Sequence, residues 1–211
     1  MTVAFLVTVV LALVVGCSLL NSPPTAVFTA SPSVGSAPLT VNFNASGSSD
    51  ADGEIVGYDW DFGDGSAGSG EFTSHTYQST GTYAGRLTVH DDAGASGHAA
   101  QDIYVAMEVT YDDLFRNNES YIGNVIYFRG KIIQVQEQLF GGYVWRVATE
   151  QNEYFGYIGD TLWVNYDGPR FLEGDIIDLC GKVKGLRTYA SIFQQVTIPE
   201  MDALGVSLYS Q

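Results

Sequence analysis

The segment Tyr58–Ser66, Tyr-Asp-Trp-Asp-Phe-Gly-Asp-Gly-Ser, constrains the fold of this chain more than any other stretch. Its apolar side chains alternate with polar ones up to Trp60 and Phe62, which is the period of a half-buried β-strand. The Gly- and Asp-rich residues 63–66 then supply the chemistry of a tight turn. A strand that ends in buried aromatic residues and turns at once predicts an all-β module built from short strands.

Further motifs occur in order on both sides of this turn. They are Ala26–Pro32 and Pro38–Ser46 before it, and His75–Tyr77, Gly81–Tyr83, Leu87–Val89 and Asp91–Gly94 after it. Together they resemble the PKD domain, an immunoglobulin-like β-sandwich of extracellular proteins, over residues 23–106. The resemblance implies about seven short strands. It also implies an adhesive, spacer or ligand-presenting role without a catalytic apparatus.

Four aromatic residues of this module are expected in its core, because aromatic side chains dominate the cores of β-sandwiches. They are Trp60, Phe62, Tyr77 and Tyr83. A platform for carbohydrate is the alternative interpretation of the same side chains.

The second half of the chain predicts a short helix followed by five strands. Thr110 is a suitable N-cap for one or two helical turns at Tyr111–Arg116. Strand patterns follow at 121–135, 143–149, 161–166, 175–183 and 192–196. Gly130 interrupts the first of these strands, and a glycine inside a strand often marks a bulge or a barrel corner. Five strands with a bent first strand predict an OB-like β-barrel.

Six short motifs of this half narrow the interpretation. They are Tyr121-Ile-Gly, Phe128-Arg-Gly-Lys-Ile, Leu172-Glu-Gly-Asp-Ile-Ile, Cys180-Gly-Lys-Val-Lys-Gly, Thr188-Tyr-Ala-Ser and Val196-Thr-Ile-Pro. Together they resemble the OB-fold domain of secreted lipoproteins, grouped with the tRNA anticodon-binding-like families, over residues 108–206. The barrel module is therefore assigned to residues 108–211. It departs from the family in its acidity and in the short connection at 167–174, which leaves little room for the usual helix.

OB-folds hold oligonucleotides or oligosaccharides on a face made of sheet and loops. Aromatic residues of a Gly-rich loop are candidates for this face, with barrel core as the alternative: Tyr154, Phe155 and Tyr157. The two tryptophans of this half, Trp145 and Trp163, are expected in the barrel core, with the binding face as the alternative. Three basic residues and a tyrosine form one local cluster: Lys182, Lys184, Arg187 and Tyr189. This cluster is either a solvated strand edge or a receptor for an anionic glycan or phospholipid headgroup.

Residues 3–20 form an uncharged apolar run followed by polar residues, so residues 1–20 are expected to be an export segment. Val14-Val-Gly-Cys17 resembles the lipobox of lipoproteins, in which the thiol of Cys17 would be diacylated and would hold the protein in the membrane. Met1-Thr2 lacks the positive charge of such a signal, so an uncleaved membrane anchor stays open. Either arrangement places the protein outside the cytoplasm, at the cell surface or the periplasmic face.

The charge distribution argues against nucleic acid as the partner. The chain has 24 acidic and 9 basic residues, and both halves are acidic, with 10 against 1 in residues 1–106 and 14 against 8 in residues 107–211. Affinity for a phosphate backbone comes mainly from Lys and Arg. The acidic surface is expected to serve solubility.

One acidic loop offers closely spaced oxygen ligands of the kind that Ca²⁺ prefers. It is Ser48–Glu54, and its carboxylates at Asp50, Asp52 and Glu54 are the candidate ligands. Asp-Gly runs are also ordinary turn formers, so a structural turn is the alternative. Calcium is the only cofactor that the sequence suggests.

No pattern of nucleophilic or metal-dependent catalysis occurs in the sequence, so a binding protein is expected and an enzyme is not. Cys180 lacks a histidine in its own half and is expected to be a small buried hydrophobe. The interpretation is a membrane-tethered binding or adhesion protein, with the sandwich as spacer or interaction module and the barrel as the module that binds an envelope protein or polysaccharide. A barrel receptor for oligosaccharide or nucleic acid is the alternative, followed by an enzyme that acts on glycosides.

Overall fold

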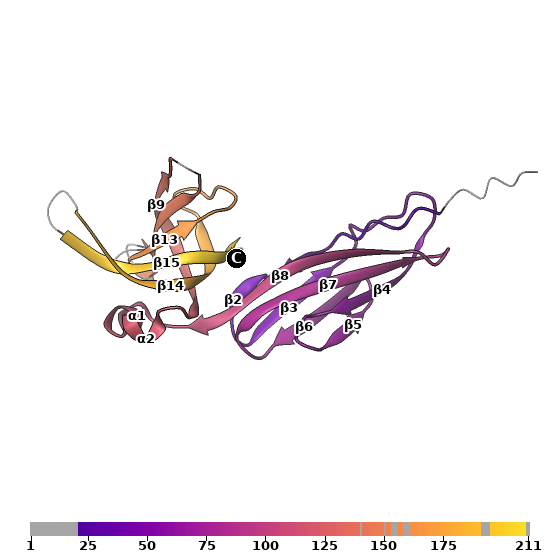
Figure 1. Ribbon diagram of the computed structural model, residues 1–211, viewed down its shortest axis with the longest axis horizontal. Helices are drawn as coiled ribbons and strands as arrows, with labels where there is room; N and C mark the ends of the chain where they lie inside the picture. The colour runs from indigo at the N-terminus through magenta and orange to yellow at the C-terminus, as the bar shows by residue number, and fades with distance from the viewer. Residues whose placement is uncertain are drawn as a thin grey trace, which may run out of the picture.

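A computed structural model describes residues 21–139, 141–149, 151–152, 156–157, 161–190 and 195–209. It contains an elongated sandwich module and a barrel module (Figure 1). The strands of the sandwich are β1 (Thr29–Ser31), β2 (Val34–Ser36), β3 (Leu39–Asn44), β4 (Ile55–Asp61), β5 (Ala67–Ser69), β6 (Phe72–Tyr77), β7 (Gly81–Asp91) and β8 (Ser96–Glu108). The barrel module contains α1 (Tyr111–Arg116), α2 (Asn118–Tyr121), β9 (Val125–Glu137), β10 (Tyr143–Ala148), β11 (Gln151–Asn152), β12 (Gly156–Tyr157), β13 (Thr161–Tyr166), β14 (Ile176–Ala190) and β15 (Gln195–Leu208). The predicted all-β class is confirmed.

The sandwich packs a sheet of order β1-β3-β6 against strands β5-β4-β7-β8. Its core lies where alternate residues of both sheets point inward, such as Val41 and Phe43 on β3 and Leu87 and Val89 on β7, all buried. This period of two is what the sequence predicted for half-buried strands.

The turn after β4 is held from both sides. Tyr77 donates from its hydroxyl to the carbonyl oxygen of Phe62 at 2.9 Å, and both side chains are buried with Trp60. Gly63 has a φ of 82°, and a Cβ there would lie 2.8 Å from the carbonyl oxygen of Ala84. Glycine is therefore required by the close backbone approach as well as by the left-handed conformation. The expectation of an aromatic core is confirmed for Trp60, Phe62 and Tyr77, whereas Tyr83 is only partly buried and packs against this core.

The five long strands of the second module form a closed ring of order β9-β10-β13-β15-β14, with β14 returning to β9. Strands β13 and β15 are parallel, and the other neighbours are antiparallel. The interior holds residues such as Trp145, Leu162 and Leu179, all fully buried, and Leu114 of α1 packs against them. Trp145 is thus in the barrel core, as expected.

The barrel's elements differ in detail from the sequence prediction. Helix α1 is capped as predicted, because the hydroxyl of Thr110 accepts from the backbone N–H of Asp113 at 3.1 Å. The first strand begins at Val125, since Asn118–Tyr121 is helical. Gly130 marks a close approach rather than the bulge itself: a Cβ there would lie 2.7 Å from the carbonyl oxygen of Ala148.

The two modules share strand β8, which pairs with β7 of the sandwich and continues into a short parallel pairing with β9 of the barrel. Val34, Ala106, Tyr127 and Cys180 form a small buried cluster at this junction. Cys180 is fully buried, as expected, and burial raises the pKa of its thiol to about 12. The thiol therefore stays protonated and packs between the modules.

Candidate functional site

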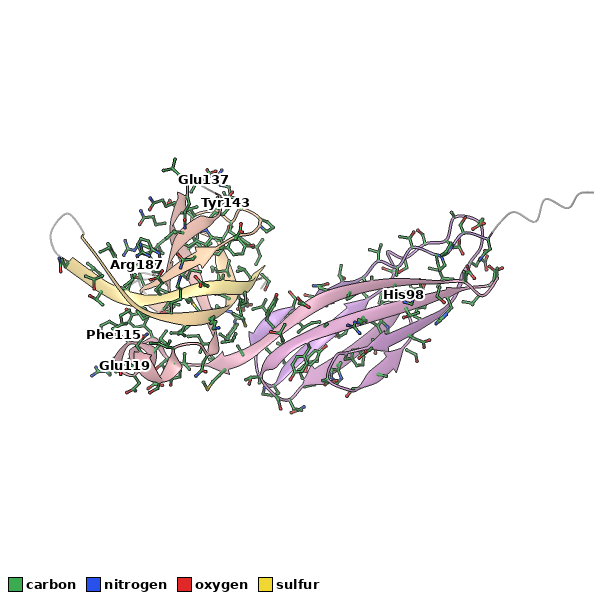
Figure 2. The ribbon with its side chains drawn as sticks, in the orientation of Figure 1. His98, Phe115, Glu119, Glu137, Tyr143 and Arg187 are labelled. Carbon is green, nitrogen blue, oxygen red and sulfur yellow. The ribbon has the colours of Figure 1, made fainter. Side chains whose placement is uncertain are left out.

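The outer side of the barrel carries an aromatic and charged surface, here called the barrel face. Its members come from four adjacent strands: Arg146 on β10, Trp163 and Asn165 on β13, Lys184, Arg187 and Tyr189 on β14, and Glu200 and Asp202 on β15. A hollow of about 780 Å³ lies over most of these residues and over the end of β9 at Gln136 and Glu137. Figure 2 shows Arg187 in the barrel, far from His98 in the sandwich.

Alternation along β13 produces this face. Leu162 and Val164 point into the barrel core. Because side chains alternate along a strand, Trp163 and Asn165 point outward. The expectation that Trp163 belongs to the core is therefore wrong. The residue is only partly buried, and its ring lies 5.5 Å from the ring of Tyr189 between centroids.

Each described cation of the barrel face contacts an aromatic ring or a carboxylate. The guanidinium of Arg187 lies 4.3 Å from the ring centroid of Trp163 and 3.0 Å from Glu200 Oε1. Lys184 lies 3.4 Å from Asp202 Oδ1. This arrangement neutralises Arg187 and Lys184 locally and holds the Arg187 guanidinium over the ring of Trp163.

The carboxylates are fixed from β13 as well. The side-chain amide of Asn165 donates to Glu200 Oε1 at 3.0 Å and to Asp202 Oδ1 at 2.9 Å. Two indole or guanidinium nitrogens of the face, Trp163 Nε1 and Arg146 Nε, are buried without a hydrogen-bond partner among the described residues. The buried nitrogens are closed to a surface ligand, so the surface offers fixed acceptors and an aromatic ring, which suits a ligand rich in hydroxyl groups.

The predicted binding residues are brought together only in part. Lys184, Arg187 and Tyr189 share the barrel face, whereas the side chain of Lys182 lies near Gly123, in the turn before β9. Tyr157 belongs to the short strand β12, paired with β11. Two further candidates, Tyr154 and Phe155, lie outside the described residues, as does the lipidation candidate Cys17.

Sequence reasoning missed four members of the barrel face: Arg146, Asn165, Glu200 and Asp202. The alternation Leu162-Trp163-Val164-Asn165 was a usable signal for Asn165. No local signal pointed to Glu200 and Asp202, because they meet Asn165 only through the parallel pairing of β13 with β15.

The acidic loop of the sandwich lies near two other polar segments. The backbone N–H of Ser22 donates to both carboxylate oxygens of Asp52 at 3.3 and 3.1 Å, and the side-chain amide of Asn21 donates to Asp91 Oδ2 at 2.8 Å. This bond from Asn21, helped by backbone N–H groups of the following turn, holds the pKa of the Asp91 carboxyl below its usual range. The N-terminal segment is thereby attached to two loops of the sandwich.

Asp50 is the member of this loop that fits a cation. Its Oδ1 accepts from the backbone N–H of Asp52 at 3.2 Å, while its Oδ2 is buried and has no partner among the described residues. An unpaired buried carboxylate oxygen is costly unless an ion or water occupies the space beside it. Glu54 differs, because its side chain is exposed. No group of three or more His, Cys, Asp or Glu in the described part of the chain is arranged to hold a metal ion.

None of the helices that the structure describes is both long and apolar enough to cross a membrane.

Comparison with known proteins places one family on part of the chain. The family model of the PKD domain matches residues 21–107. Collagenase ColA of Clostridium perfringens is 42% identical over 65 residues, covering 31% of this chain and 6% of the collagenase. The microbial collagenase of Vibrio alginolyticus is 36% identical over 86 residues, covering 41% of this chain and 10% of the collagenase.

Among solved structures, the PKD1 domain from the Vibrio cholerae metalloprotease PrtV has 37% sequence identity and a TM-score of 0.36, and the match covers 40% of this chain and 98% of that domain. The chain spans a tenth or less of the length of the two collagenases. The family match at residues 21–107 supports the PKD domain that the sequence predicted at residues 23–106, and PKD domains occur in extracellular proteins as spacer or interaction modules.

Proposed function

We propose that this protein is an extracytoplasmic binding protein whose barrel face recognises a neutral oligosaccharide of the cell envelope, without catalysis. The observation that carries the proposal is the partly exposed ring of Trp163, flanked by Arg187 and by the fixed carboxylates of Glu200 and Asp202. Sugars offer apolar C–H faces for an aromatic ring and hydroxyl groups for carboxylates and amides.

The barrel topology supports the choice of this face. The ring order β9-β10-β13-β15-β14, with the parallel pair β13 and β15, fits the five-stranded Greek-key barrel of an OB-fold. In that fold, the face of the second and third strands and the neighbouring loops hold the ligand. The corresponding strands here are β10 and β13, which carry Arg146, Trp163 and Asn165.

Charge favours a neutral ligand over nucleic acid. A phosphate backbone needs a row of Lys and Arg along its path, whereas the described lining of this hollow has only two cations, Arg187 and Lys184, and each lies beside a carboxylate. Glu200 and Asp202, which line the hollow, would repel phosphates there.

In this proposal, the N-terminal segment 1–20 tethers the protein to the membrane through a lipid on Cys17 or as an apolar anchor, and the PKD domain spaces the barrel from the membrane. Ca²⁺ bound beside Asp50 and Asp52 would fix Asn21 and Ser22, and with them the base of the spacer, against the sandwich. The support for the cation is the unpaired oxygen of Asp50.

Isothermal titration calorimetry tests the binding proposal. The full chain in a detergent without sugar groups is titrated with cellohexaose, mannohexaose and chitohexaose. At least one sugar should bind, and Trp163→Ala should weaken its binding by about tenfold or more, equivalent to about 1.4 kcal/mol. Phe72→Ala is the matched control, because this aromatic side chain is exposed on the sandwich.

Three results would contradict the proposal. The first is equal loss of affinity in both variants or no sugar binding at all. The second is preference for an oligothymidylate over every sugar, which would indicate a nucleic-acid receptor. The third is release of reducing ends from the bound sugar, which would indicate an enzyme.

The calcium proposal has its own test. Ca²⁺ at about a hundredfold excess over its Kd should stabilise the sandwich by about 2.7 kcal/mol relative to the chelated protein. Asp50→Asn should abolish the rise in Tm that Ca²⁺ causes, whereas Asp102→Asn, at an exposed carboxylate on β8, should retain it. Equal responses of the two variants would exclude the site at Asp50.

A further inference from the structure

A second hollow lies between the two modules, away from the barrel face. This junction cleft has a volume of about 480 Å³, within the range of small-molecule sites. One wall is the sandwich segment 30–39, and the other consists of barrel residues on β9, β14 and the end of β15. The cleft therefore exists only in the two-module protein.

The walls of the junction cleft are held together by regular structure. Strand β2 (Val34–Ser36) pairs with β8, and β8 pairs in turn with β9. Behind the cleft, Val34 packs with Tyr127 and Cys180 in the buried junction cluster. Paired strands and a packed cluster preorganise the cleft, so a ligand would not have to order it.

Arg129 is the only cation among the described residues that line this cleft. Asp178 accepts from Arg129 Nε at 2.7 Å and from Nη2 at 3.2 Å, and it also accepts from the hydroxyl of Tyr127. The guanidinium carbon lies over the ring of Tyr209, 3.8 Å from its centroid. These contacts fix the position of the guanidinium on one side and one face.

The fixed guanidinium still has donors to offer. A guanidinium carries five N–H groups, and Asp178 engages only Nε and one hydrogen of Nη2. The side chain of Arg129 is 43% exposed, whereas that of Asp178 is 9% exposed. A planar, preoriented donor edge that faces a cleft matches the two oxygens of a carboxylate.

Hydroxyl groups supply the side-chain polar part of the remaining lining, whose other members are apolar residues and a glycine. Tyr209 and four serines contribute these hydroxyls: Ser31, Ser33, Ser36 and Ser207. Hydroxyls both donate and accept hydrogen bonds, so they complement a ligand that is itself rich in hydroxyls. A fatty acid or an apolar peptide would leave these groups unpaired at a cost.

We propose that the junction cleft binds a carboxylate-bearing sugar of the hexuronate class, with the carboxylate on the free edge of Arg129 and the sugar hydroxyls against the serine wall. This site is distinct from the barrel face and does not rest on it. It would give the protein a second recognition site whose two walls come from different modules.

Calorimetry of the full chain with glucuronate, glucose and acetate tests the proposal. Glucuronate should bind, and glucose and acetate should each bind at least about tenfold more weakly, because each lacks one half of the recognised chemistry. Arg129→Lys keeps the charge but removes the paired N–H donors of the guanidinium, so the affinity for glucuronate should fall by about tenfold or more. Ser31→Trp, which fills the cleft from an exposed position of the sandwich, should do the same.

Trp163→Ala on the barrel face should leave glucuronate affinity unchanged, which separates this site from the proposed function. Thermal unfolding of each variant shows whether the fold is intact. If Arg129→Lys fails to fold, Ser31→Trp alone tests whether glucuronate binds in the junction cleft. No binding of glucuronate up to about 50 mM would overturn the proposal. Binding that acetate equals, or that a folded Ser31→Trp variant retains, would also overturn it.

Discussion

The two tryptophans of the barrel should differ sharply in their effect on stability, because alternation places them on opposite sides of the same wall. Trp145 is fully buried, with its ring 4.3 Å from that of Tyr166 and 5.5 Å from that of Phe171. Replacing it with alanine removes a large buried ring and leaves a cavity, which costs about 3–5 kcal/mol. Trp163 is partly exposed, and its replacement removes mainly the contact with Arg187, worth about 1 kcal/mol.

Urea unfolding of the full chain, followed by far-ultraviolet circular dichroism, measures both effects. With a denaturant dependence of about 2 kcal/mol/M, Trp145→Ala should lower the midpoint of the barrel transition by about 2 M and Trp163→Ala by about 0.5 M. The midpoint of the sandwich transition should change little in both variants, and it serves as the internal control.

A third variant separates ring volume from the indole nitrogen. Trp145 Nε1 is buried and has no hydrogen-bond partner among the described residues. Trp145→Phe keeps most of the ring and removes the unpaired donor, so it should cost less than about 1.5 kcal/mol. Equal losses for Trp145→Ala and Trp163→Ala would refute the outward assignment of Trp163 and the barrel face with it.

Three further perturbations test other parts of the structure. Tyr77→Phe removes the hydroxyl that donates to Phe62 and should destabilise the sandwich by about 1 kcal/mol in urea unfolding; no change would contradict a contribution of this bond. Gly205→Ala would place a Cβ against the ring of Tyr104 at the junction, and overpacking should cost about 1–3 kcal/mol and change the small-angle scattering profile; an unaltered profile and stability would mean that the junction is loosely packed. Because the pKa of Asp91 is lowered in the fold, its contribution to stability is present above its unfolded pKa of about 3.9 and is lost as the pH falls through the folded value. Asp91→Asn should therefore make the Tm depend less on pH below about pH 4. The same fall of Tm with pH in the variant and the unmodified protein would contradict this role of Asp91.

The sandwich was predictable because its signals are local. The turn at residues 63–66 and the aromatic residues before it lie within one short segment, and period two assigns their sides directly. The same holds for helix α1, whose N-cap Thr110 and first turn are adjacent in sequence.

The barrel face was less predictable because its members meet through pairing of distant strands. Asn165 contacts Glu200 and Asp202 across the parallel pair β13 and β15, more than 30 residues apart in sequence. The junction cleft was still harder to predict from the sequence, because Ser31 and Arg129 line the same hollow only when the two modules are packed together. Their residue types carry no pattern that links them along the chain.

Strand β14 shows why alternation alone fails at the barrel face. Ile177, Leu179 and Val183 point into the barrel, so an unbroken period of two would send the odd-numbered Arg187 and Tyr189 inside as well. The pairing with β15 runs from Val183–Met201 directly to Gly185–Glu200, so Lys184 is an extra, unpaired residue.

One extra residue reverses the sides of all residues after it, which carries Arg187 and Tyr189 out of the core and onto the barrel face. Gly185 follows the extra residue with a φ of 136°, a conformation that other residues rarely adopt. The glycine at 185 was thus the sequence signal for the bulge, and an interpretation that places a bulge there puts the basic cluster outside the barrel.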